Sequence, residues 1–406
     1  MYSLNQYLTM FVRTLFYVRR GGPQIVSYFY ITFVYMRINK HILILFICWF
    51  LINGFLFYFL GIKYAIDTTR FEAEATAWLN GQLEPSYRLW YSGYIAVLVV
   101  CKSIFHSIYP SIIFQYLLSF VSILLFYKGL CKLLKNEQPA FFTSLLVLCY
   151  IPIQQWNTCL LTESIFISLI LLFVWAFSIE KTTQKWLMLI LISVLATTVR
   201  PNGGILLISC FTLYGIQTIQ QDKTFPVFFS IGIAIALLIL HIFTDTFYQF
   251  LLDSFNKSEV ICGYDHWTSP GKTHIPNDDS TGSITKILDL ISSNPVKSLQ
   301  LFVSRFVALW SDLRIYYSLS HNIYIGFYLL IAYAAAIIGF NQYRKAFAEL
   351  AWMTLLYCGM NSLLVMITYA DWDGRFLAPL LPLIFIWSGL GIYFSIQFLK
   401  RKNTVV

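Results

Sequence analysis

Long, continuous apolar runs constrain the fold of this chain more than any other feature of its sequence. Residues 41–62 form the clearest run, which is long enough to cross a bilayer as a helix at about 1.5 Å per residue. Because apolar residues follow one another and do not alternate with polar ones, helices are favoured over barrel strands. The sequence predicts about ten transmembrane helices, at residues 41–62, 112–133, 141–153, 164–179, 186–198, 204–219, 225–243, 323–340, 350–368 and 377–399.

The composition excludes an ordinary soluble protein. Of 406 residues, 58% are hydrophobic and 12% are charged, and the mean hydropathy is +0.68. The net charge of +9 has no nucleic-acid-binding motif beside it, so the basic residues are interpreted as orientation signals in cytoplasmic loops. We therefore predict an all-α, multi-pass integral protein of the plasma or inner membrane, with no nucleic-acid partner.

The polar stretches divide the chain into regions. Residues 1–40 are basic and aromatic, which predicts an interfacial N-terminal arm, and residues 400–406 predict a basic cytoplasmic tail. The transmembrane domain between them, 41–399, contains two large outer segments. The first, 63–110, is predicted to hold juxtamembrane helices, and the second, 245–321, is a long outer loop.

Residues 94–109 decide the predicted topology. This run is apolar but short, and Lys102 and His106 interrupt it, so we interpret it as a juxtamembrane or re-entrant helix that does not cross. The basic loops that follow then share one side with the basic arm, and the positive-inside rule makes that side the cytoplasm. Those loops contain Lys128, Lys132, Lys135, Lys181, Lys185, Lys223, Arg344 and Lys345.

The opposite side of the membrane receives most of the acids and the non-terminal arginines. Within the long loop, the helical periodicity of 284–313 is broken at Asn294-Pro295, and the part after the break is amphipathic, which predicts a helix on the membrane surface. Loops far apart in sequence thus predict one composite site at the outer water–lipid boundary. Its predicted parts are residues 63–94, 162–164, 200–203, 245–321 and 371–375.

Two acids at the edges of apolar runs are candidate catalytic groups. Asp67 is the first acid after the first span, where low dielectric and nearby charge tune a carboxylate for work as a general base. It precedes a helical run, so it is also a candidate helix N-cap. Glu163 begins the span 164–179, where it either belongs to the site or interacts with the helix dipole.

Five segments place charged residues next to apolar runs: DTTRFEAEATAWLNGQLEPSYR from Asp67, NTCLLTESIFISLILLF around Glu163, TTVRPNGGILL around Arg200, NPVKSLQLFVSRFVALW from Asn294 and DWDGRFLAPLLPLIFIW from Asp371. In the same order, they resemble segments of the GT-C glycosyltransferases of glycosyltransferase family 39. This group uses polyprenyl-phosphate sugars, and it includes the protein O-mannosyltransferases and the lipid A aminoarabinose transferase. The resemblance implies a GT-C-like bundle of transmembrane helices with its active site on the non-cytoplasmic face.

The resemblance also implies roles for individual residues. Asp67 matches the family's proposed catalytic base, with Glu163 as the second catalytic candidate. Guanidinium groups pair bidentately with phosphate, so arginines at this depth suit a polyprenyl-phosphate donor, although helix-end arginines also snorkel to the interface. The candidate phosphate ligands are Arg88, Arg200 and Arg375, and the candidate donor or acceptor contacts are Arg70, Tyr87, Asp371 and Asp373.

A metal cofactor is not implied with certainty. Thr68 stands where the family pattern has a second acid, and Tyr87 stands where some members carry a metal-ligating Glu. His266 and His274 are candidate ligands for a divalent metal, although their spacing matches no standard site.

The expected activity is transfer of a sugar from a polyprenyl-phosphate donor to a lipid, glycan or protein acceptor, with inversion at the anomeric carbon. A polymerase or ligase of lipid-linked glycans would need similar outer arginines. A third candidate function is that of a lipid or glycan transporter or flippase. Transporters place ionisable residues near the bilayer midplane and often contain internal repeats, neither of which this sequence shows.

Overall fold

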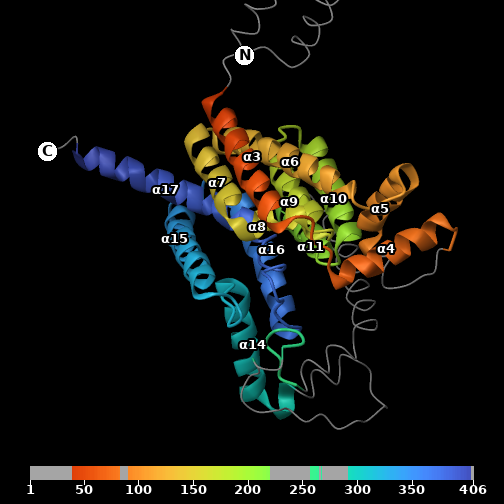
Figure 1. Ribbon diagram of the computed structural model, residues 1–406. Helices are drawn as coiled ribbons and strands as arrows, with labels where there is room; N and C mark the ends of the chain where they lie inside the picture. The colour runs from red at the N-terminus through yellow and green to blue at the C-terminus, as the bar shows by residue number, and fades with distance from the viewer. Residues whose placement is uncertain (1–38, 83–89, 220–256, 265–266, 268–290, 404–406) are drawn as a thin grey trace, which may run out of the picture. The chain divides into compact units, whose positions relative to one another are not determined.

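The computed structural model describes residues 39–82, 90–219, 257–264, 267 and 291–403 (Figure 1). The chain divides into two compact units, Met1–Ile44 and Leu45–Val406. The predicted N-terminal arm falls in the first unit and, except for residues 39 and 40, lies outside the described residues. The site and its neighbours belong to the second unit.

The described part of the chain is helical, as the apolar runs predict. Its only β pairings are two isolated bridges, Lys63 with Cys159 and Ile261 with Ala370. Six described helices are long and apolar enough to cross a bilayer, which identifies a polytopic membrane protein. They are α3 (Lys40–Leu60), α6 (Ser111–Leu134), α10 (Thr182–Val199), α15 (Leu319–Tyr343), α16 (Ala348–Ile367) and α17 (Leu381–Asn403).

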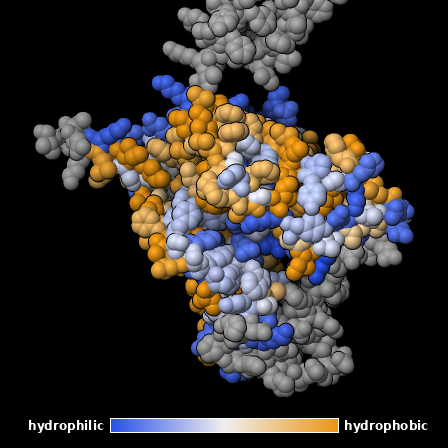
Figure 2. Space-filling model, in the orientation of Figure 1, coloured by the Kyte–Doolittle hydropathy of each residue, from blue (hydrophilic) through white to orange (hydrophobic). Residues whose placement is uncertain are grey.

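The outward faces of these helices are apolar. Phe50 and Phe59 of α3 are 61% and 63% exposed, and Phe327 and Leu330 of α15 are 65% and 67% exposed. Figure 2 shows hydrophobic residues over α3 and α15. Because water would penalise so much exposed hydrocarbon, these faces are suited to lipid.

Other predicted spans form shorter apolar helices, and that these cross the membrane stays a prediction. Residues 141–153 correspond to α7 (Glu137–Cys149, 13 residues), 164–179 to α9 (Glu163–Ala176, 14 residues), and 204–219 to α11 (Gly203–Ile219, 17 residues). Residues 225–243 lie outside the described part. The helix α7 ends where Tyr150 takes an extended conformation, and the short helix α8 (Ile151–Gln154) follows with Pro152 in its first turn.

The core forms around α9, whose side chains are buried on almost every side. The helices α6, α9 and α10 pack side by side, and α17 packs against α15 and α7 (Figure 1). Close approach of α15 and α17 depends on small residues. A Cβ on Gly391 would stand 1.9 Å from the carbonyl oxygen of Ala335, so only glycine fits there.

The first outer segment contains α4 (Ile66–Leu79) and α5 (Ser92–Phe105), which pack against each other. The sequence predicts a short helix at 94–109, and α5 is 14 residues long, ending at His106 in the left-handed conformation. That it does not cross the membrane stays a prediction.

The amphipathic helix of the long outer loop is α14 (Pro295–Ser311), which begins at the predicted break. Its apolar side chains face outwards, with Val296 and Leu299 68% and 61% exposed. Its buried face instead carries Ser298 and Arg305. The buried face also carries Leu301, Ala308 and Leu309, so α14 has apolar side chains on both faces. Its exposed apolar side chains are suited to contact with lipid, in keeping with the predicted surface position.

Candidate functional site

Arg375 lies at the centre of a cluster of charged side chains. It comes from the turn before α17, and its Nη1 is 3.1 Å from Oδ2 of Asp67, a residue 308 positions earlier. Its Nε donates to Oε1 of Glu163. Burial alone would lower the pKa of the Arg375 guanidinium, but the carboxylates of Glu163 and Asp67 raise it overall above the ordinary value. Arg375 is therefore held as a permanent cation.

Arg200 reaches the same carboxylate from the end of α10. Its Nη1 donates to Oε1 of Glu163 over 2.8 Å, and its guanidinium lies 5.8 Å from the ring centres of both Phe166 and Phe376. Glu163 is completely buried, and it is the first residue of α9. A buried carboxylate is costly unless it is paired, and here two guanidinium groups and the helix dipole share that task.

Asp67 is not a helix cap, so that interpretation is wrong. The N-cap of α4 is Ala65, and Asp67 lies in the first turn. The capping interaction belongs to Thr68, whose hydroxyl accepts the Ala65 N–H at 3.0 Å and donates to the carbonyl of Leu160 at 2.9 Å. The Asp67 carboxylate is thereby left for Arg375 and for Arg70, whose Nη1 is 3.6 Å from Oδ1.

Backbone pairing fixes α4 beside the start of α9. The N–H of Lys63 donates to Thr158, and the N–H of Leu160 donates to Lys63, over 2.9 and 3.0 Å. Together with the Thr68 bond, these contacts tie the first outer segment to the residues just before Glu163. Asp67 and Glu163 are therefore placed by a continuous set of hydrogen bonds.

Hydrogen bonds with two buried side chains fix the turn 371–375. Asp371 is buried, and its carboxylate accepts the backbone N–H groups of Arg375 and Phe376. The fully buried Arg314 donates to the carbonyls of Asp371 and Trp372 over 3.0 and 3.2 Å. Asp371 thus positions Arg375 instead of pointing towards a ligand, whereas Asp373 is exposed.

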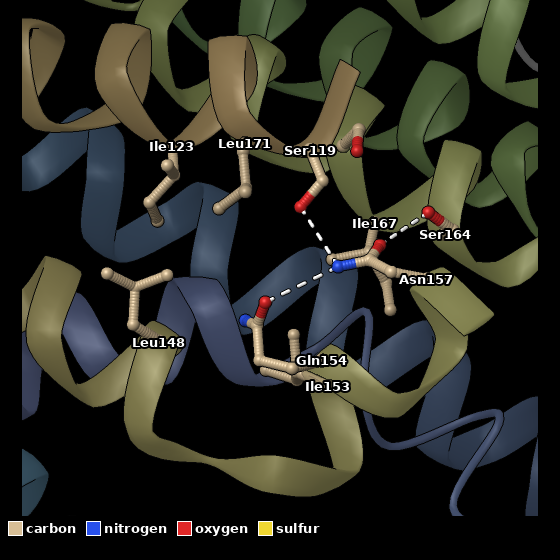
Figure 3. Close-up of a pocket in the computed structure, with 10 residues that line it drawn as sticks. Ser119, Ile123, Leu148, Ile153, Gln154, Asn157, Ser164, Ile167 and Leu171 are labelled. Atoms are coloured by element: carbon tan, nitrogen blue, oxygen red, sulfur yellow. Dashed lines mark hydrogen bonds between the residues drawn. The ribbon is translucent and has the colours of Figure 1, made fainter. Parts of the chain in front are cut away.

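A polar network anchors the start of α9. The short 3-10 helix η2 (Gln155–Thr158) carries Asn157, whose amide donates to Asn53 at 2.8 Å and to Ser119 at 3.1 Å. Ser164, which follows Glu163, donates to the Asn157 carbonyl oxygen at 2.6 Å. Figure 3 shows Ser119, Asn157 and Ser164 at a small cavity between the helices. Because the network joins α3, α6, η2 and α9, it fixes the residue next to Glu163.

The predicted residues divide into three groups. Asp67, Glu163, Arg200 and Arg375 come together, with Arg70 at their edge. Asp371 supports the turn, and Asp373 is exposed beside it. The other predicted residues lie outside the described part of the chain, namely Arg88, Tyr87, His266 and His274.

A divalent cation does not fit the described cluster. Glu163 and Asp67 both face guanidinium groups, whose positive charge repels a second cation. No group of three or more His, Cys, Asp or Glu side chains suited to a metal occurs among the described residues. The predicted histidine ligands lie outside them.

Sequence reasoning missed two residues near the site. Tyr91 lies beside the cluster, where burial raises the pKa of its hydroxyl while Arg200 and Arg375 oppose the rise. Arg314 is the second. Arg314 lies nine positions after Arg305, close to the end of α14. Both arginines are fully buried. Arg314 lies beyond the end of α14, so no helical periodicity in the sequence marks it as buried.

Comparisons with known proteins leave the chemistry of this cluster to be argued from its own residues. No family model matches the chain, and no curated protein or solved structure matches it either.

Proposed function

We propose that this protein is an integral-membrane glycosyltransferase that moves a sugar from a polyprenyl-phosphate donor to an acceptor on the non-cytoplasmic face. One observation carries the proposal: two arginines and two carboxylates from four separate turns meet in one cluster beside membrane-spanning helices. A donor with a long apolar tail and an anionic phosphate needs such a combination of lipid-facing helices and guanidinium groups.

The arginines have donors left for a phosphate. Among contacts with the described residues, Glu163 and Asp67 engage Nη1 of Arg200 and both Nε and Nη1 of Arg375. The Nη2 group of each guanidinium remains to donate to phosphate oxygens. Glu163 is buried and holds both arginines, so it positions them and is not the base.

Asp67 is the proposed general base. It is about one-third exposed, so an acceptor hydroxyl can reach it, whereas Glu163 is closed to solvent. Asp67 takes the proton of the acceptor O–H, the acceptor oxygen forms a bond to the anomeric carbon, and the bond from that carbon to the phosphate oxygen breaks. The phosphate leaves with the electron pair, and Arg200 and Arg375 stabilise its charge. A single displacement inverts the anomeric centre.

Binding of undecaprenyl phosphate, with undecaprenol as the uncharged comparison, tests the proposal. We expect purified protein to prefer the phosphate, Arg375→Ala to weaken binding by more than about tenfold, and Arg375→Lys to restore part of it. Thermal melts check folding of each variant. Arg344→Ala is the matched control, because Arg344 is an exposed arginine in a predicted cytoplasmic loop. Equal binding of the alcohol and the phosphate would contradict the proposal.

Reaction products separate this function from a flippase. A flippase would bind the same donor but leave the bond between sugar and phosphate intact. We therefore expect cells that make this protein to release free polyprenyl phosphate and to carry a glycan that is absent without it, as measured by mass spectrometry of surface glycans and lipids.

A further inference from the structure

Four aromatic side chains form a second feature next to the charged cluster. We call Tyr264, Tyr316, Tyr317 and Trp372 the aromatic platform. The ring of Trp372 lies 5.2 Å from the rings of both Tyr264 and Tyr316, and Tyr316 lies 5.2 Å from Tyr317. These tilted and edge-on contacts between rings are the favourable ones for aromatic pairs.

Hydrogen bonds to the backbone carbonyl of Trp372 hold the aromatic platform in place. The carbonyl oxygen of Trp372 accepts hydrogen bonds from the hydroxyls of Tyr316 and Tyr317 and from Nε of the buried Arg314. Three donors on one carbonyl fix the position of this residue. Its side chain nevertheless remains 40% exposed. A tryptophan that is both rigid and exposed offers a large contact surface at little cost in side-chain entropy.

An interfacial aromatic belt does not account for this arrangement. Tyrosines in such a belt turn their hydroxyls towards lipid headgroups and water. Here the hydroxyls of Tyr316 and Tyr317 turn inwards to a protein carbonyl. These two hydroxyls are therefore not directed at headgroups.

Charges of both signs surround the platform. The exposed carboxylate of Asp373 follows Trp372 directly. Burial and Asp371 raise the pKa of Asp373, while Arg375, Lys63 and Arg314 oppose the rise. With acids and bases mixed in this way, the surroundings favour a neutral polar ligand over a simple cation.

The platform lies close to the candidate donor site. Trp372 precedes Arg375 by three residues, so their Cα atoms are at most about 11 Å apart. A ligand on the ring of Trp372 would thus lie at the same turn that supplies Arg375.

We propose that the aromatic platform binds a sugar ring of the acceptor, a role that rests on the proposed transferase function. The C–H face of the sugar stacks on Trp372, and a hydroxyl of the same ring donates to the carboxylate of Asp373. A sugar ring has one apolar face and a rim of hydroxyls, which matches an exposed indole beside a carboxylate.

Saturation-transfer NMR on the full chain in phospholipid nanodiscs tests this assignment, since sugar-based detergents would compete. The probes are the methyl glycosides of glucose, mannose, galactose and N-acetylglucosamine, with tetramethylammonium as the cationic comparison. We expect transfer to the ring protons of at least one glycoside. Trp372→Ala should weaken it about tenfold, Trp372→Phe should keep part of it, and Asp373→Asn should reduce it.

Trp352→Ala is the matched control, because Trp352 is 51% exposed but lies on α16. It should leave the signals unchanged, and a thermal melt identifies any variant that does not fold. The assignment is overturned if no glycoside receives saturation, if Trp372→Ala and Trp372→Phe behave like wild type, or if only tetramethylammonium binds. The assay uses no donor, so its outcome is separate from binding of undecaprenyl phosphate: either can fail while the other succeeds.

Discussion

Asp67 differs from the other acid of the cluster in exposure, and the difference predicts the effect of mutating it. Asp67→Asn keeps the size of the side chain but cannot accept a proton. Because the N-cap of α4 is Ala65, folding should not depend on this carboxylate. We expect a normal thermal melt and a loss on the order of 10²–10⁴ in single-turnover rate.

The control for Asp67→Asn is Glu72→Gln in the same helix. Glu72 also forms an ion pair, with Lys102 at 3.2 Å, but belongs to no part of the charged cluster. The Glu72→Gln variant should have the same single-turnover rate as wild type. Near-normal turnover of Asp67→Asn would remove Asp67 as the base.

Asp312 predicts a dependence of stability on pH. It is buried at the end of α14, where burial raises the pKa of its carboxyl from 3.8 to about 7. The folded protein therefore keeps this proton at pH values where the unfolded chain has lost it, and this contribution to stability falls as the pH rises from about 4 to 7. Asp312→Asn lacks the titrating proton while its side-chain oxygen can still accept from Tyr150.

We expect the stability of Asp312→Asn relative to wild type to increase with pH in this window, by up to about 1.4 kcal/mol per pH unit. Thermal melts between pH 4 and 8 measure it. Glu349→Gln, which removes a half-exposed acid, is the control. If the melting temperatures of wild type and Asp312→Asn change with pH in the same way, Asp312 is not the source of this pH dependence.

At the scale of the elements, the turn between α10 and α11 places Arg200. The N–H of Gly203 donates to the carbonyl of Arg200 over 2.9 Å. A Cβ on Gly203 would stand 2.3 Å from the carbonyl carbon of Ala196, which is too close for any side chain. The two helices can therefore meet only at a glycine.

Gly203→Ala should push the two helices apart, cost about 1–3 kcal/mol of stability and weaken binding of undecaprenyl phosphate. Gly359→Ala in α16 is the control, since a Cβ there meets nothing within 4 Å. It should be neutral or slightly stabilising. Thermal melts and the binding assay measure both variants, and equal melting temperatures would show that the turn tolerates a side chain.

The sequence predicts the helical membrane class and the residues of the charged cluster because charges at the edges of apolar runs are conspicuous. Asp67, Glu163 and Arg375 all stand at such edges, and they meet in the structure. It does not predict where each helix ends, because composition does not show that Tyr150 becomes extended after α7. It also does not show that Arg314 turns inwards, since an arginine near an amphipathic helix is usually solvated.

At the scale of the whole molecule, the membrane orientation stays a prediction, and it can be tested with two single cysteines. In a variant without the eight native cysteines, Asp373→Cys places a thiol at an exposed turn that is predicted to lie outside, and Lys132→Cys places one at the predicted cytoplasmic end of α6. A membrane-impermeant maleimide should label the first in intact cells and the second only after permeabilisation. Labelling of both from one side would contradict the orientation.

The span of 308 positions between Asp67 and Arg375 has a consequence for biosynthesis. A ribosome that has translated α9 and α10 has supplied Glu163 and one of its two guanidinium partners. The second comes only with the turn before α17, so a nascent chain stopped earlier would hold Asp67 and Glu163 without the guanidinium that contacts both carboxylates. Synthesis of the last membrane helix therefore also completes the charge balance of the interior, and a truncated product would differ from the finished protein in electrostatics as well as in length.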